Sequence, residues 1–161
     1  MSRQIVLDTE TTGLEVEQLH RIIELGCIEL ENRRPTRNNL HRYFNPEREI
    51  DPGAMKVHGI SNERVAGEPT FSQRAREIWD YLSGAELIIH NASFDVGFLD
   101  AEFARAGITQ KLAEVCAITD TVAMARRLHP GQKVNLDALC KRYGVDNSQR
   151  DFHGALLDAQ L

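Results

Sequence analysis

Four acidic residues stand in three separated segments of the chain, and each lies beside apolar residues that can carry it into a shared pocket. Carboxylates brought together repel one another, and proteins keep such groups mainly where a divalent cation or a shared proton offsets the repulsion. A histidine precedes the last acid by five residues, and the set is typical of a two-metal site that cleaves phosphodiester bonds. The acids are Asp8, Glu10, Asp95 and Asp158, and the histidine is His153.

Taken singly, the acids also have ordinary explanations. Residues two apart in a strand point to the same side, so Asp8 and Glu10 project together, which a solvent-facing strand edge would tolerate as well. Asp95 falls in the first turn of a predicted helix, where the helix dipole favours acids in any protein. An ordinary explanation is harder to find for Asp158, because its neighbours in the chain are apolar. The combination is therefore more informative than any one member.

His153 is the candidate general base. A separation of five residues places it ~140° from Asp158 around a regular helix. The two side chains serve one site only if Asp158 lies inside a helix and His153 lies at or before the first turn. The pKa of histidine lies near working pH, as a general base requires. The alternative is a surface histidine at a helix start.

Composition and length set the class of protein. The 161 residues fit one domain over 1–161 that is large enough to bury a sizeable core. The cysteines are far apart and are predicted to be small buried residues of a protein from a reducing compartment. No signal peptide and no apolar run of membrane-spanning length is found, so we expect a soluble, cytoplasmic protein. The cysteines are Cys27, Cys116 and Cys140.

The net charge of −5 argues against a strong, sequence-independent grip on nucleic acid, which comes from Lys and Arg. It does not exclude a nuclease, because bound divalent metals reverse the local sign of charge and a partner can hold a weakly binding enzyme on its substrate. Other catalytic patterns are missing from the sequence, among them nucleotide-binding glycine loops, the Gly-x-Ser-x-Gly elbow and a Cys/His zinc spacing.

Hydrophobic periodicity and turn residues predict how these side chains are positioned. Residues 21–30 and 40–44 form a predicted antiparallel hairpin, and residues 45–69 are expected to be a long loop rich in Pro and Gly. The pattern of a three-stranded meander followed by alternating helix and strand favours an α/β fold with a mixed sheet. The last helix has no stop signal before Leu161, so we expect the natural chain to continue. Strands are predicted at 5–7, 21–30, 40–44, 86–90 and 115–119, and helices at 71–82, 93–106, 121–128, 135–143 and from about 153.

Three motifs resemble those of the DnaQ-like 3′→5′ exonucleases that use a histidine base. They are Asp-Thr-Glu-Thr-Thr-Gly at 8–13, His-Asn-Ala-Ser-Phe-Asp at 90–95, and His153-x-x-x-x-Asp158. The resemblance covers nearly the whole chain, and segments 22–26, 57–60, 119–121 and 135–140 are similar to the proofreading subunits of bacterial replicative polymerases.

The resemblance implies an RNase H-like fold with a five-stranded mixed sheet and helices on both faces. It implies two Mg²⁺ or Mn²⁺ ions held by the four acids, and water activation by His153. In the family, the histidine that matches His58 contacts the terminal nucleotide. The nucleotide pocket would be lined by Thr9, Thr11, Leu14, Val57 and Phe94.

One departure from the family concerns the segment before His58. The proofreading subunits carry Asp-Pro-Glu where this chain has Asp51-Pro52-Gly53. A side-chain contact to the nucleotide would be lost at Gly53, which leaves at most a backbone contact. The family's polymerase-tethering segment is also expected to be absent from residues 1–161.

The resemblance implies a proofreading 3′→5′ exodeoxyribonuclease that acts on single-stranded or frayed DNA 3′ ends and works with a replicative DNA polymerase subunit. The domain alone is expected to be a monomer. Two alternatives stay open: an exoribonuclease of the same superfamily, and a non-catalytic polymerase-associated module. The module is disfavoured because all four acids and the histidine are present.

Overall fold

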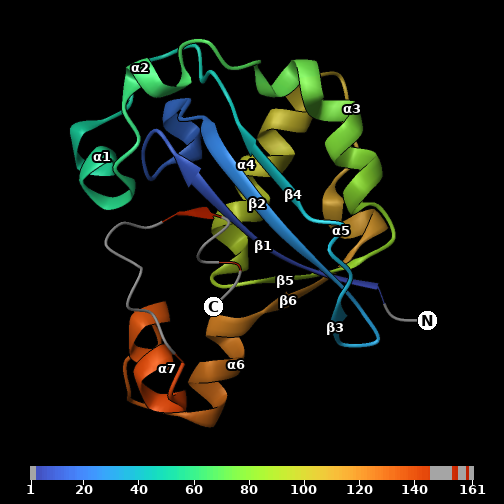
Figure 1. The fold of residues 1–161 in the computed structure, drawn as a ribbon, viewed down its shortest axis with the longest axis vertical. Coiled ribbons are helices and arrows are strands. Elements are labelled where there is room, and N and C mark those ends of the chain that lie inside the picture. The colour runs from blue at the N-terminus through green and yellow to red at the C-terminus, as the bar shows by residue number, and fades with distance from the viewer. Residues whose placement is uncertain (1–2, 146–153, 156–158, 160–161) are drawn as a thin grey trace.

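The computed structural model describes residues 3–145, 154, 155 and 159, and over these residues the chain forms one mixed sheet flanked by helices (Figure 1). The strand order is β3-β2-β1-β5-β6, and β4 also pairs with β2. The pairs β1–β2, β2–β3 and β2–β4 are antiparallel, whereas β1–β5 and β5–β6 are parallel. The strands are β1 (Arg3–Thr11), β2 (Ile22–Glu31), β3 (Arg34–Pro35), β4 (Leu40–Tyr43), β5 (Glu86–Ile89) and β6 (Ala117–Asp120).

The predicted α/β class, the mixed sheet and the antiparallel β2–β4 hairpin are confirmed. The predicted number of five strands is wrong for the described residues, because the hairpin turn contains β3, which pairs with Leu30 and Glu31. A two-residue strand is too short to show a periodic pattern, and the proline in it, Pro35, is typical of turns, so the sequence did not indicate β3. Proline is tolerated there because β3 is at the edge of the sheet.

Several helices follow their capping signals closely. Thr70 and Gln73 form a capping box at the start of α3, and Asn135 accepts a hydrogen bond from Ala138 N at the start of α7. Gly144 ends α7 in the left-handed conformation, as its position after the apolar pattern predicts. The helices are α1 (Pro52–His58), α2 (Asn62–Val65), α3 (Phe71–Leu82), α4 (Ala92–Arg105), α5 (Leu112–Val115), α6 (Thr121–Leu128) and α7 (Leu136–Tyr143), with a 3₁₀ turn at Val16–Gln18.

The segment 45–69 is not the long loop that its Pro and Gly residues predicted, because it contains α1 and α2. Pro52 occupies the first turn of α1, and Gly59 closes it with a left-handed backbone and a 2.8 Å hydrogen bond to Met55 O. Proline at a helix start and glycine just past its end are helix signals as well as loop signals. Ser61 caps α2 in the same way that Thr70 caps α3.

Two boundaries near the site also differ from the predictions. Helix α4 begins at Ala92 rather than at Ser93, and the residue before it, Asn91, has a left-handed backbone with φ 67°. The predicted strand at 115–119 is displaced to Ala117–Asp120, because residues 112–115 form the short helix α5. Of the predicted last helix, Ala155 and Ala159 are helical, and His153 and Asp158 lie outside the described residues.

The main core lies on the side of the sheet covered by α3 and α4 (Figure 1). Ile5 and Leu7 of β1 point into it and are almost fully buried. The ring of Phe103 on α4 lies 5.2 Å from that of Phe71 and 5.0 Å from that of Trp79, both on α3. All three cysteines are buried, as predicted. Within the described residues no helix is long and apolar enough to cross a membrane.

Candidate active site

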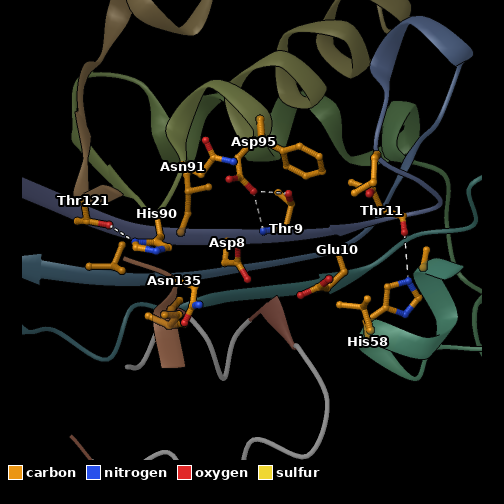
Figure 2. A pocket seen from close by; sticks show the side chains of 18 of the residues that line it. Asp8, Thr9, Glu10, Thr11, His58, His90, Asn91, Asp95, Thr121 and Asn135 are labelled. Carbon is orange, nitrogen blue, oxygen red and sulfur yellow. Dashed lines mark hydrogen bonds between the residues drawn. The ribbon is translucent and has the colours of Figure 1, made fainter. Parts of the chain in front are cut away.

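Asp8 and Glu10 project from β1 on the side opposite Ile5 and Leu7, as the period of two requires (Figure 2). The register of the β1–β2 pair places Gly26 opposite Asp8, so no side chain of β2 stands directly beside that carboxylate. Asp8 is half-buried and Glu10 is buried. The strand register shifts between Glu10 and Thr11, where β1 leaves its regular pairing with β2.

The turn after β1 is held by a buried histidine. The imidazole of His20 packs so closely on Gly13 that a Cβ there would come within 2.3 Å of the ring carbon Cε1. His20 Nδ1 also lies 2.8 Å from Thr12 Oγ1, and Thr11 Oγ1 donates to Gly13 O at 2.6 Å. Only glycine fits at position 13, which explains the last residue of the 8–13 motif physically.

His58 is buried against the end of β1 with its tautomer defined by its neighbours (Figure 2). Ile60 N donates to His58 Nδ1 at 3.0 Å, so the proton of the neutral ring is on Nε2. Nε2 lies 3.1 Å from Thr11 O and donates to it. Both ring nitrogens are thus hydrogen-bonded within the protein. The predicted nucleotide contact by His58 would therefore have to use the carbon edge of the ring or the backbone.

Asp95 is held by Thr9 rather than by the acids of β1 (Figure 2). Its Oδ1 accepts a 3.1 Å hydrogen bond from Thr9 N and a second one from Thr9 Oγ1. Burial raises the pKa of Asp95 to about 7, although the Thr9 hydrogen bonds oppose this shift, and the nearby Asp120 carboxylate adds to it. A nearby positive charge would stabilise the ionised form of a carboxyl whose pKa is raised by burial.

The start of α4, which carries Asp95, is fixed to the end of β6. Asp120 Oδ1 accepts hydrogen bonds from Asn91 N at 3.1 Å and from Val122 N at 2.9 Å. His90 Nδ1 lies 2.8 Å from Thr121 Oγ1 in the same junction. Sequence reasoning gave Asp120 no role, although its position before an apolar helical pattern is the usual signal of a helix cap.

One cleft of about 1460 Å³ gathers all nine candidate residues that the structure describes. Leu14 and Val57 are exposed apolar residues on its wall, with 82% and 44% of their surfaces accessible. Helix α7 and its N-cap residue also line the cleft, through Asn135 and Tyr143 among others. The nine candidates in the cleft are Asp8, Thr9, Glu10, Thr11, Leu14, Val57, His58, Phe94 and Asp95.

The described part of the chain does not by itself present a finished metal site, since no group of three or more His, Cys, Asp or Glu side chains in it is placed to hold an ion. Asp8 and Glu10 are on one side of β1, and Asp95 bonds to Thr9 from the other (Figure 2). The donor chemistry nevertheless fits hard cations such as Mg²⁺ and Mn²⁺, which prefer carboxylate oxygens. His153 and Asp158 are outside the described residues.

Gly53, the departure from the family pattern, lies in the first turn of α1 and lines the cleft. A Cβ added there would meet nothing within 4 Å. Glycine is therefore not required at position 53 by crowding or by backbone conformation.

An open cleft with paired carboxylates on the central strand of such a sheet is typical of RNase H-like nucleases, and the comparisons agree. The chain belongs to the exonuclease family, whose model matches residues 5–161. It is similar to DNA polymerase III subunit epsilon of Haemophilus influenzae, with 54% identity over 166 residues, which cover 99% of this chain and 64% of the relative. The chain thus spans just under two thirds of that relative's length.

Two solved exonucleases have the same fold. Exonuclease X in complex with 5′-overhanging duplex DNA superposes with a TM-score of 0.70 and 27% identity, covering 97% of this chain and 84% of that one. Exonuclease I superposes with a TM-score of 0.84 at 18% identity, covering 99% of this chain and 39% of that one. The predicted RNase H-like fold is confirmed.

Proposed function

We propose that this chain is a metal-dependent 3′→5′ exodeoxyribonuclease that proofreads during DNA replication. The observation that carries the proposal is the cleft, which brings the paired acids of β1, the buried Asp95 and the exposed apolar residues Leu14 and Val57 into one space. A cleft of this composition suits a terminal nucleotide, because apolar side chains hold the base and sugar while carboxylates face the scissile phosphate. Residues 1–161 would form a single exonuclease domain.

Asp8, Glu10, Asp95 and Asp158 would hold two divalent cations, Mg²⁺ or Mn²⁺. The Thr9 hydrogen bonds to Asp95 both use Oδ1, so the other oxygen is not part of that contact. When bound, such cations stabilise the attacking and leaving oxygens of an in-line displacement. Burial, which raises the pKa of Asp95, supports the cation assignment, because a nearby positive charge restores the ionised form.

His153 would act as the general base. In its neutral form it accepts a proton from the attacking water, and its ordinary pKa near 6.5 is suited to that step at about neutral pH. It would not be a metal ligand. The products would be nucleoside 5′-monophosphates.

The substrate would be a single-stranded or frayed DNA 3′ end. Thr9, Thr11, Leu14, Val57 and Phe94 would surround the terminal nucleotide, with His58 behind the end of β1. Mispaired ends would be preferred because unpairing them costs less than unpairing a matched end.

The net charge of −5 leaves the domain with little electrostatic grip on DNA. A replicative DNA polymerase would supply the missing affinity by holding the domain near the primer end, and the similarity to a DNA polymerase III subunit supports this partner. We propose that the domain is monomeric alone and works in the cytoplasm.

Digestion of 5′-labelled matched, mispaired and single-stranded DNA, beside RNA of equal length, tests the proposal in Mg²⁺ and in Mn²⁺. The mispaired and single-stranded DNA should shorten fastest from the 3′ end. Asp80→Asn, which changes an exposed acid on α3, should behave as the wild type does. Faster hydrolysis of RNA would assign the enzyme to exoribonucleases, and activity that persists in EDTA would contradict the metal mechanism.

A further inference from the structure

A second buried glutamate lies beside the acids of β1 on the same side of the sheet. Glu24 of β2 is the direct partner of Glu10 in the antiparallel register, and the two are only 3% and 8% exposed. Like charges placed opposite each other weaken a sheet, and burial increases the cost. Glu24 therefore needs a specific set of partners, although the sequence gives it no role in the site.

The carboxylate of Glu24 bridges two distant parts of the chain. Its Oε2 lies 2.6 Å from Nε2 of His41 on β4, and its Oε1 accepts a 3.0 Å hydrogen bond from the backbone N–H of Ala155. The register places His41 opposite Gly26, so no β2 side chain stands between the imidazole and Glu24. His41 reaches Glu24 diagonally, and Tyr43, the direct partner of Glu24 on β4, also interacts with the carboxylate, so that both side chains orient it.

The hydrogen bond to Ala155 satisfies a backbone donor at the start of the last helix. Ala155 is helical, whereas Gly154 before it is not, so the Ala155 N–H belongs to the first turn, where backbone donors lack partners within the helix. A carboxylate satisfies such a donor and interacts favourably with the positive end of the helix dipole. Glu24 thus caps the start of this helix from the sheet, although it lies 131 positions earlier in the chain, whereas a capping side chain usually comes from the adjacent residues.

We propose that Glu24, oriented by His41 and Tyr43, is a positioning residue that anchors Ala155, and with it the segment of the chain that carries His153 and Asp158, to the sheet. The inference rests on the proposed exonuclease function. Ala155 is two residues from His153 and three from Asp158 in the chain, so an anchored Ala155 N–H limits where both can lie. Through Glu24 the start of the last helix is joined to β2, the strand that pairs with β1 and its acids Asp8 and Glu10.

Three variants separate positioning from ordinary stability. Glu24→Met removes the acceptor at similar volume, and Glu24→Gln keeps an oxygen that can accept from Ala155 N. Glu29→Met is the matched control, because Glu29 is also buried on the same strand, five residues away on the opposite side, and bonds to Arg3 and Thr36 instead. All are assayed well below their melting temperatures, with folding checked by circular dichroism.

In Glu24→Met, kcat should fall by about 10–100-fold, the usual effect of losing a partner behind a ligand, with little change in KM. Hydrogen exchange at the Ala155 amide should accelerate in the same variant. Glu24→Gln should recover most of kcat and of the amide protection. Glu29→Met should leave both at the wild-type level, even where it lowers the melting temperature as much.

Equal loss of kcat in Glu29→Met and Glu24→Met, or unchanged Ala155 exchange in Glu24→Met, would overturn the positioning role while leaving the exonuclease assignment intact. Wild-type protein that degrades no DNA would overturn the exonuclease assignment itself. In that case accelerated Ala155 exchange in Glu24→Met would still support the anchoring contact, because that readout does not depend on catalysis.

Discussion

The two sides of strand β1 have opposite chemical character. Ile5 and Leu7 point into a core completed by the aromatic rings of α3 and α4. Asp8 and Glu10, on the same strand, point into an open cleft. Because alternate residues of a strand face opposite sides, one segment supplies both the packing that holds the sheet and the carboxylates proposed for catalysis.

The contrast shows where stability and chemistry oppose each other. Burial of apolar side chains such as Ile5 stabilises the fold, whereas the buried Glu10 and Glu24 face each other as like charges. Substitutions of Asp8 or Glu10 should therefore change activity, whereas substitutions of Ile5 or Leu7 should change stability.

The largest effect is expected for Asp8→Asn, which should abolish measurable cleavage while leaving the free energy of unfolding unchanged or raised. The amide has nearly the shape of the carboxylate but lacks the charge that a divalent cation needs. Cleavage of labelled single-stranded DNA and urea unfolding of the same preparation measure the two quantities. Substantial cleavage by Asp8→Asn in Mg²⁺ would place the catalytic acids elsewhere.

The next largest effect is expected for His153→Ala, with turnover reduced by ~10²–10⁴-fold, as is typical of a lost acid–base group. In the wild type, activity should rise with pH through an apparent pKa near that of histidine, and this rise should vanish in the variant. Mn²⁺ affinity by calorimetric titration should survive in His153→Ala and weaken in Asp158→Ala. Equal losses of Mn²⁺ affinity would make His153 a ligand.

On the apolar side, Ile5→Ala should lower the free energy of unfolding by about 2–5 kcal/mol, because it leaves a cavity in a fully buried position. The folded fraction should cleave DNA at the wild-type rate at a temperature far below its melting point. Activity lost in proportion to stability under those conditions would show that the two sides of β1 are not independent.

Local signals made much of this contrast predictable. The period of two placed Asp8 and Glu10 together, and capping residues gave the ends of α3 and α7. The same local rules failed at 45–69, where Pro52 and Gly59 mark the ends of α1 rather than a loop. Proline and glycine occur both in loops and at helix ends, and only the surrounding packing determines which of the two forms.

Contacts between distant residues could not be predicted from one sequence. The bond between Thr9 and Asp95 spans 86 positions, and that between Glu24 and Ala155 spans 131. Neither pair has a sequence pattern of its own, because each depends on how β1 and β2 pack against later elements. Residue types and spacing indicated the acids and His153, and the resemblance to the exonucleases added the nucleotide-pocket residues, but neither indicated the partners that hold them.

The smallest effect is expected for Glu29, which lies on the core side of the sheet. Like Glu24 on the opposite side, it is a buried glutamate of β2, so the two can be compared directly. Glu29 accepts hydrogen bonds from Arg3 Nε and Thr36 Oγ1, each at 2.6 Å. Burial acts to raise its pKa, but the hydrogen bonds from Thr36 and Arg3 and the charge of Arg3 together outweigh burial and lower it. Unlike the acids of the cleft, Glu29 is expected to support stability alone.

Because the pKa of Glu29 is lower in the folded protein than in the unfolded chain, its contribution is complete above the unfolded value of about 4.3 and is lost as pH falls through the folded value. Glu29→Gln should therefore be less stable than the wild type by about 1 kcal/mol at pH 7, since Arg3 is partly exposed and solvent weakens the pair. The difference should shrink as pH falls from about 5 to 3, with DNA cleavage unchanged at neutral pH. Urea unfolding of both proteins across this pH range measures the difference in their free energies of unfolding. A difference that stays constant down to pH of about 3 would show that ionisation of Glu29 does not stabilise the fold.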